Sequence, residues 1–251
     1  MAASRPCDGE LRLGPDAVPP PKGSALGFKS WMREMGSIAQ VSFAPPAFPS
    51  DVPRGHGETV LLIPGFLAGD WVMARLGKFL SGAGYRVEMS GIAFNAGPTP
   101  RQIAHLETRL LSLAEENGPL FLVGQSLGGV FARNLARFHP QAVRHVVTLG
   151  TPIHFPVTTP LEPVAKLLSR FHDPKWRAER DTIAMPLPVP LTAIYSERDG
   201  IVDWHQCLQS PANNNETIRH ENIRVDSSHS AMASHPETQR IIAHALGGAC
   251  P

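Results

Sequence analysis

The segment over residues 119–138 limits the fold of this chain more than any other part of the sequence. An apolar run, Pro119–Val123, is followed at once by Gly124-Gln125-Ser126-Leu127-Gly128, and a helical pattern begins directly after it. Apolar residues recur in that pattern at helical spacing, at Val130, Phe131, Leu135 and Phe138. A continuous apolar run is typical of a strand covered on both faces, so the segment predicts a buried strand, a sharp turn and a helix.

The same alternation of strand and helix patterns continues on both sides of this segment. We expect strands over residues 58–66, 85–92, 119–123, 143–149, 191–196 and 222–226. We expect helices over residues 70–82, 99–117, 128–138 and 236–245, and the second of these opens on a start signal formed by Thr99, Pro100 and Gln102. Alternating strands and helices predict an α/β fold with a mostly parallel central sheet and helices on both of its faces.

The two glycines around Ser126 indicate the chemistry that the turn serves. A serine that attacks a carbonyl group is held between strand and helix on a turn so sharp that its backbone is strained. Side chains two residues before and two residues after it would collide with the strand or the helix, so glycine suits Gly124 and Gly128. The pattern therefore predicts that Ser126 is a nucleophile.

Four features in chain order make the sequence resemble the α/β-hydrolase superfamily, over roughly residues 58–246. They are the strand that ends in Pro64-Gly65-Phe66, the turn around Ser126, the acid-bearing stretch Ser196–Val202, and Ser228-His229 after the last expected strand. Within the superfamily the chain resembles small bacterial lipase- and esterase-like serine hydrolases. It has Pro64 and Gln125 where many lipases have histidine, and neither difference removes a catalytic group.

The resemblance implies a catalytic triad and a site for the oxyanion. Ser126 would be the nucleophile, His229 the base that takes and returns its proton, and Asp199 the acid that orients the imidazole. The backbone N–H groups of Phe66 and Leu127 would form the oxyanion hole.

The residues themselves leave competitors for two of these roles. Asp203 and Asp226 are the alternatives to Asp199, which we favour because it directly follows a strand and a turn. His235 is the alternative to His229, and its position before Pro236 is typical of an ordinary residue at a helix start.

Domain boundaries follow from where the alternation of strands and helices begins and where it is interrupted. We expect an N-terminal extension over residues 1–57, a hydrolase domain over residues 58–251, and a lid or cap insert over residues 153–190. The insert has apolar residues at helical spacing, which predict an amphipathic helix, at Val157, Leu161, Val164, Leu168 and Phe171. The extension is expected to be partly disordered, with a short helix at Phe28, Trp31, Met32 and Met35. We favour docking of this helix on the core over binding of a partner or contact with a membrane surface.

Composition excludes several other classes of protein. A formal net charge of +1 with no concentrated basic run argues against nucleic acid as a partner, and no apolar stretch has the length of a membrane span. We see no secretory signal, and three cysteines give no disulfide framework beyond an optional Cys7–Cys250 bridge, so we expect a cytoplasmic protein. No histidine lies at metal-ligand spacing from cysteine or carboxylate neighbours, so we expect neither a metal nor a cofactor. The oligomeric state is left open.

The predicted function is hydrolysis of carboxylic esters, with an apolar small-molecule ester as the substrate and an acyl-serine intermediate. An acyltransferase or thioesterase on the same fold is the first alternative, and products formed in water and in alcohol would separate hydrolysis from acyl transfer. A non-catalytic binding protein of hydrolase fold is the second, because a fold by itself does not establish an activity. An active-site probe would label Ser126 in either enzyme but not in a non-catalytic binding protein.

Overall fold

The structure is a computed structural model, and it describes residue 34 and residues 52–178, 182–210 and 218–248. The short helix expected around Phe28 and Met35 lies outside the described residues, apart from Glu34, which is helical and buried. The boundary expected at residue 57 stays a prediction. Among the described residues, no helix combines the length and the apolar composition needed to cross a bilayer.

Six strands of the described chain form one parallel sheet in the order β2–β1–β3–β4–β5–β6. Their bounds are β1 Thr59–Ile63, β2 Arg86–Met89, β3 Leu120–Gln125, β4 Val143–Leu149, β5 Leu191–Tyr195 and β6 His220–Arg224. The chain leaves β1 toward one edge of the sheet and returns to β3 on its other side. The carboxyl ends of β1 and β3 therefore meet at a reversal of strand order, where open parallel sheets bind ligands.

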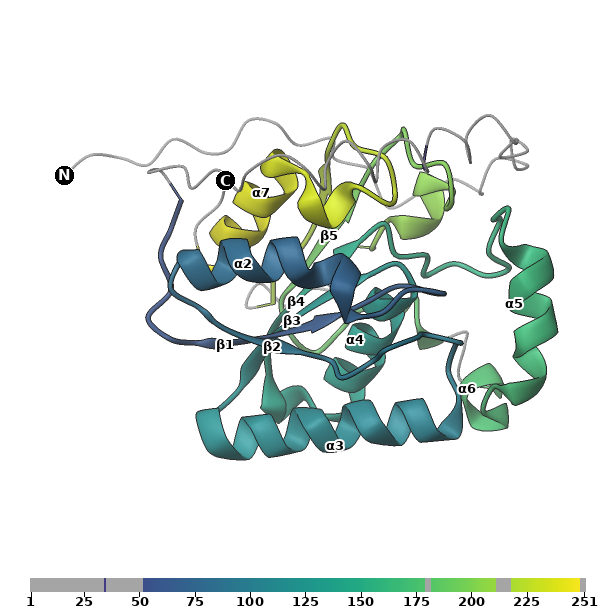
Figure 1. Ribbon diagram of the computed structural model, residues 1–251, viewed down its shortest axis with the longest axis horizontal. Helices are drawn as coiled ribbons and strands as arrows, with labels where there is room; N and C mark the ends of the chain where they lie inside the picture. The colour runs from purple at the N-terminus through teal and green to yellow at the C-terminus, as the bar shows by residue number, and fades with distance from the viewer. Residues whose placement is uncertain (1–33, 35–51, 179–181, 211–217, 249–251) are drawn as a thin grey trace.

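Helices cover both faces of this sheet, as the sequence predicted. Their bounds are α2 Ala74–Gly82, α3 Pro100–Asn117, α4 Leu127–Phe138, α5 Glu162–Leu168, α6 Pro174–Ala178 and α7 Pro236–Leu246. Figure 1 shows α3 and α4 below the sheet and α2 and α7 above it. Side chains alternate between the two faces of the sheet along a strand. Leu61 and Ile63 of β1 therefore pack in the core between the sheet and helices α3 and α4. Val60 and Leu62 pack in the core between the sheet and helices α2 and α7.

Local signals in the sequence explain why several of these elements begin where they do. Thr99 caps α3, since its hydroxyl accepts a hydrogen bond from the N–H of Gln102 at 3.2 Å, and Pro100 is the first helical residue. His235 is the N-cap residue of α7, which agrees with its expected place at a helix start.

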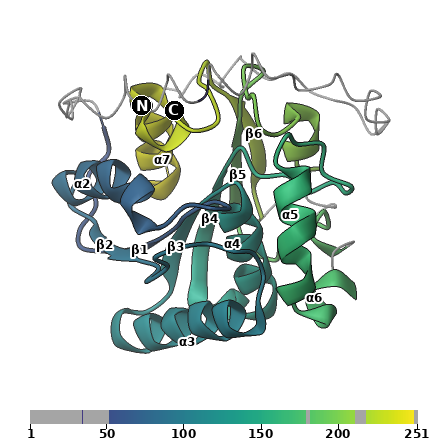
Figure 2. The same ribbon diagram turned by 45° about the vertical axis from the view of Figure 1, so that its right-hand side comes forward.

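Several elements differ from their expected bounds by a few residues; β2, for example, ends at Met89 rather than at residue 92, and α2 begins at Ala74 after a short 3₁₀ turn. Two of the differences have a clear physical reason. The last strand begins two residues earlier than predicted, at His220, because it is an edge strand with mixed polar and apolar side chains and gives only a weak pattern. The helix of the insert begins at Glu162 rather than near Val157, because prolines at positions 156 and 160 lack the backbone N–H that a longer helix needs. Figure 2 shows α5 and α6 together, outside the two helix layers.

Candidate active site

Ser126 lies on a strained turn between β3 and α4. Its backbone has φ 52° and ψ −121°, and its N–H donates to the carbonyl of Leu149 at the end of β4, at 2.7 Å. In the described chain the other non-glycine residue with positive φ is Leu67, in the loop after β1. Both strained residues thus follow the two strand ends where the sheet reverses its order, and strain of this kind collects at functional sites.

The glycines of the turn are required by close packing, as the sequence predicted. A Cβ atom on Gly124 would overlap the backbone of Gly128, and one on Gly128 would overlap the carbonyl oxygen of Ile63. A Cβ atom on Gly129 would likewise overlap the side-chain hydroxyl of Thr151. These contacts let α4 start directly against β1 and β3, which gives the sharp turn on which Ser126 lies.

His229 and Asp199 form a buried pair beside this turn. Nδ1 of His229 lies 2.6 Å from Oδ2 of Asp199, and the side chains are 9% and 1% exposed. The carboxylate can only accept, so Nδ1 carries the proton and Nε2 of His229 is free to accept one. The other carboxylate oxygen accepts from the N–H groups of Ile201 and Val202, at 2.8 and 2.7 Å, which fixes its orientation.

The backbone connects this pair to Ser126. Gly150 follows Leu149, the residue bonded to Ser126, and a Cβ on Gly150 would lie 2.9 Å from Oδ2 of Asp199 and 3.0 Å from Nδ1 of His229. Within the described residues, Ser126 Oγ makes no hydrogen bond to His229. Nucleophile–base hydrogen bonds are often long without substrate and tighten when it binds.

The structure directs the competing acids and the competing histidine elsewhere. Asp203 accepts from the N–H of His205 at 3.1 Å and lies 2.8 Å from its Nδ1, so it caps the 3₁₀ helix Trp204–Cys207. Asp226 is mostly exposed and forms an ion pair with Arg198 at 2.9 Å. His235 is the residue at the start of α7.

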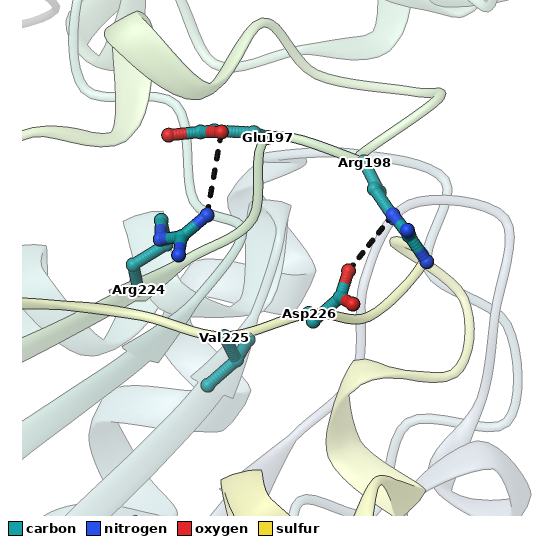
Figure 3. A pocket seen from close by; sticks show the side chains of 5 residues that line it. All are labelled: Glu197, Arg198, Arg224, Val225 and Asp226. Carbon is teal, nitrogen blue, oxygen red and sulfur yellow. Dashed lines mark hydrogen bonds and ion pairs between the residues drawn. The ribbon is translucent and has the colours of Figure 1, made fainter.

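Asp226 lines a separate surface pocket behind the acid-bearing loop. Figure 3 shows Arg198 turned toward Asp226, and Arg224 turned toward Glu197. The Arg224–Glu197 ion pair has an N–O distance of 3.4 Å. Each arginine already has a carboxylate partner, so the pocket has no spare charge for a ligand.

Gln125 holds the loop that carries His229. Its side chain is buried, and Nε2 donates to the carbonyl oxygen of His229 at 2.8 Å. The sequence marked Gln125 only as a departure from the lipase pattern. The structure shows that Gln125 instead binds the backbone of His229.

The loop after β1 lies against the turn that carries Ser126. Gly65 lies against Ser126, since a Cβ on Gly65 would be 3.2 Å from that of Ser126. In the described chain, neither the N–H of Phe66 nor that of Leu127 donates to another residue, and Leu127 is at the unsatisfied first position of α4. Both N–H groups are therefore available to a ligand.

Asn95 shapes this loop, and the sequence analysis missed it. It is fully buried, and its side-chain amide donates to the carbonyl of Pro64 at 2.9 Å, while its backbone exchanges hydrogen bonds of 2.8 Å with Leu67 and Ala68. Its side-chain oxygen accepts from Gln102 of α3 at 2.7 Å. No local motif marks such a residue, because its partners lie in a loop about thirty positions away.

The electrostatics of the site favour a charged imidazole. Burial by itself lowers the pKa of His229, but the charge of Asp199, the hydrogen bond to Asp199 and the charge of Glu34 outweigh it and raise the pKa above its ordinary value. Burial raises the pKa of the nearby Cys207 thiol well above its usual range, so that thiol is neutral. Among the described residues no three histidine, cysteine or acidic side chains gather as metal ligands do.

Hydrogen bonds join the segment over residues 153–190 to the rest of the chain at several places, including the following three. Gln206 accepts from the N–H of Thr158 at 2.9 Å and donates to the carbonyl of Pro156 at 2.7 Å. The N–H of Asp173 donates to Pro98 at 2.8 Å, and two arginines of α4 bind carbonyls of residues 183–186. Between these points α5 buries none of its residues, and the most exposed apolar side chains of the stretch are Leu167 and Phe171.

Comparisons with known proteins agree with this architecture. A family model described as the alpha/beta hydrolase fold matches residues 99–185. No curated protein matches the chain. A solved structure of lipase B from Aspergillus fumigatus is 16% identical with a TM-score of 0.61, and the match covers 81% of this chain and 56% of that one.

Two smaller proteins match over nearly their whole length. A structure titled for LipS and LipT, two metagenome-derived lipolytic enzymes, is 18% identical with a TM-score of 0.56, over 78% of this chain and 95% of that one. Carboxylesterase CesB from Bacillus subtilis is 13% identical with a TM-score of 0.52, over 88% and 99% of the two chains. Identities this low establish the fold and not the reaction.

A parallel sheet whose strand order reverses at β1 and β3, with a strained serine turn after β3, defines an α/β-hydrolase fold. The chain therefore has the α/β-hydrolase fold, and the family model of that fold matches it over residues 99–185.

Proposed function

We propose that this protein is a serine hydrolase of carboxylic esters, with Ser126 as nucleophile, His229 as base and Asp199 as the acid that orients the base. The observation that carries the proposal is the buried pair formed by His229 and Asp199, which lies at the one backbone junction that also holds the strained Ser126. Surface histidine–aspartate pairs are common, but a buried pair with both carboxylate oxygens occupied is typical of a catalytic site.

In the first half of the reaction, Ser126 Oγ attacks the carbonyl carbon of the ester while its proton passes to Nε2 of His229. The negative charge that develops on the carbonyl oxygen is stabilised by the N–H groups of Phe66 and Leu127, each worth about 3 kcal/mol in comparable sites. The tetrahedral intermediate then collapses. The bond to the alkoxy group breaks, the proton moves from His229 to the departing alcohol, and an acyl-Ser126 ester is left.

In the second half, water attacks the acyl carbon and gives its proton to His229. The same donors hold the new oxyanion, and the proton returns to Ser126 Oγ as the carboxylic acid leaves. Asp199 stays ionised throughout and stabilises the imidazolium that forms twice in each turnover.

Apolar residues near the site support an apolar substrate. Exposed Trp71 and Phe94 follow β1 and β2, close to the loop that carries Phe66, and Leu167 and Phe171 are exposed on the segment over residues 153–190. The lipolytic enzymes and the carboxylesterase among the matched structures support esters as the substrate class. We propose that this segment acts as a lid over the acyl group.

Fluorophosphonate labelling followed by mass spectrometry tests the nucleophile. We expect labelling at Ser126 in the wild type and none in Ser126→Ala. Turnover of p-nitrophenyl esters of increasing chain length then measures the acyl preference, and Ser126→Ala should lower kcat by about 10⁴-fold or more. Equal labelling of both proteins would contradict the proposal.

His235 provides the matched control for the base. His229→Ala should lower the labelling rate as strongly as it lowers kcat, while His235→Ala should keep both near the wild-type values. The reverse pattern would move the base to His235.

A further inference from the structure

Glu34 is a buried carboxylate that neither the resemblance nor the proposed mechanism uses. It is 1% exposed, and it comes from the part of the chain expected to be an N-terminal extension. Its Oε1 accepts from the N–H groups of Gly200 and His229, both at 2.9 Å, and its Oε2 accepts from the N–H of Ser230 at 2.8 Å. These partners are 166 to 196 positions away in the sequence.

The three donors belong to the two loops that carry the candidate acid and base. Gly200 directly follows Asp199, and the other two donors are His229 itself and its neighbour Ser230. One oxygen atom of Glu34 therefore binds both loops at once. Burying a carboxylate is costly unless donors replace its water, and here backbone N–H groups of both loops do so. Any separation of the loops would leave this charge without part of its solvation.

We infer that Glu34 is a positioning residue, which fixes the loop of His229 against the loop of Asp199 and adds a second negative charge beside the imidazole. The inference rests on the proposed function, because it assigns Glu34 to the site where His229 is the base. Glu34 holds the backbone N–H of His229, Gln125 its carbonyl oxygen and Asp199 its Nδ1. Nδ1 is thus occupied by Asp199, and Nε2 is the ring nitrogen left to accept the proton in the proposed mechanism.

The charges around His229 fix the sign of the effect. Asp199 comes from the loop after β5 and Glu34 from the N-terminal part of the chain, and both favour the imidazolium against the effect of burial. The buried thiol of Cys207 beside Asp199 is neutral, and Asp203 lies beyond it, bonded to His205. Removal of the Glu34 charge must therefore lower the pKa of His229. Because the base must be neutral to act, the acidic limb of kcat/KM should move to lower pH.

The test compares Glu34→Gln and Glu34→Asp in the full chain with p-nitrophenyl esters. Gln keeps the shape but loses the charge and turns one acceptor into a donor that faces an N–H group, and Asp keeps the charge but is too short to reach both loops. We expect kcat per fluorophosphonate-titrated site to fall about ten- to a hundred-fold in each, which is the usual effect of a displaced catalytic group, with KM little changed. The acidic limb should move only in Glu34→Gln.

Glu197→Gln is the matched control. It removes a carboxylate from the same loop as Asp199, at an exposed position paired with Arg224, and changes net charge by the same amount. We expect its kcat and its acidic limb to match the wild type. If both Glu34 variants also kept wild-type kcat and pH dependence per titrated site, with only stability reduced, Glu34 would be a structural residue and the inference would be wrong.

A measurement without turnover separates this inference from the proposed function. The imidazole of His229 can be titrated by NMR in Ser126→Ala protein, with His229→Ala to assign the signal. Its pKa should be above the ordinary histidine value and should fall when Glu34→Gln is added. That fall would support the inference even if no ester were hydrolysed, whereas an unchanged titration would overturn it even in an active enzyme.

Discussion

At the scale of single residues, the candidate site depends on close approaches of backbone to side chain. Gly150 makes the close approach to the buried pair of His229 and Asp199. Its φ of +52° is in the left-handed region, and the space where a Cβ would lie is filled by Asp199 and His229. A glycine at this position therefore lets the end of β4 touch the pair that we assign to catalysis.

Gly150→Ala should damage the activity far more than the fold. The added methyl group would lie 2.9 Å from Oδ2 of Asp199, so the carboxylate and the imidazole must move apart. We expect kcat for a p-nitrophenyl ester to fall about ten- to a hundred-fold. The positive φ adds a loss of about 1–2 kcal/mol in the free energy of unfolding, measured with urea.

Gly248→Ala separates these two effects. Gly248 has φ +70° after the end of α7, and among the described residues, its neighbours in sequence apart, no heavy atom lies within 4 Å of the position a Cβ would take. It should show a similar loss of stability with wild-type kcat. If Gly150→Ala also kept wild-type kcat, the contact with the pair would have no role in catalysis.

Sequence reasoning at this scale succeeded where a residue type has a fixed place along the chain. Gly124 and Gly128 were predicted because they lie at set distances from Ser126. Glu34 and Asn95 could not be predicted, because each binds backbone atoms of loops that only the folded chain brings near. A buried polar side chain that solvates a distant loop has no sequence pattern of its own.

At the scale of elements, strands and helices with strong local signals were predicted well. β4 has its expected bounds, and α3 begins at its predicted cap. The edge strand β6 and the helix α5 were displaced, since neither buries a continuous apolar face and their limits depend on prolines and neighbouring strands. Periodicity predicts an element when burial enforces it, and neither of these two elements has a buried residue.

α4 connects Ser126 to the proposed lid. It begins directly after Ser126, and its Arg133 is 1% exposed and donates to the carbonyls of Ile183 and Met185 at 2.6 to 3.0 Å. Burial, together with the charge of Arg137, lowers the pKa of Arg133 to about 9. Arg133 thus stays charged at neutral pH, and the carbonyls that end the segment over residues 153–190 replace its water.

Arg133→Lys should destabilise the protein although it keeps the formal charge. An ammonium group cannot reach both carbonyls in the plane that guanidinium uses, and it is more strongly hydrated, so its burial costs more. We expect the free energy of unfolding in urea to fall by about 2–3 kcal/mol. Arg137→Lys, one turn along α4 and only half-buried, should cost less than about 1 kcal/mol. Equal small losses would mean that Arg133 does not anchor the segment.

At the scale of the whole molecule, two histidines at different places in the sheet respond to acid in opposite ways. His229, at the carboxyl ends of the strands, has a raised pKa. His145 lies early in β4, where Nε2 is 3.0 Å from the hydroxyl of Thr192, which in turn donates to Glu221 at 2.9 Å. Burial lowers the pKa of His145 to about 4, with contributions from the charges of Arg219 and His220. As the pH falls, protonation of His229 should therefore reduce catalysis before protonation of His145 weakens the fold.

His145 sets the pH window in which the fold weakens. In the unfolded chain its pKa is about 6.5, so between pH 6.5 and 4 the unfolded state binds a proton that the native state resists. The contribution of His145 is thus complete above pH 6.5 and falls as pH drops through that window, by at most about 3 kcal/mol.

His145→Gln isolates this contribution. Gln can still donate to Thr192 but does not titrate, while His220 and His229 are common to both proteins and cancel in the comparison. Urea unfolding at pH 7 and at pH 4.5 should show a loss of about 2–3 kcal/mol more for the wild type than for His145→Gln over this interval. Equal losses would mean that His145 takes up its proton without unfolding, and that the network from β4 to β6 opens to water when it does.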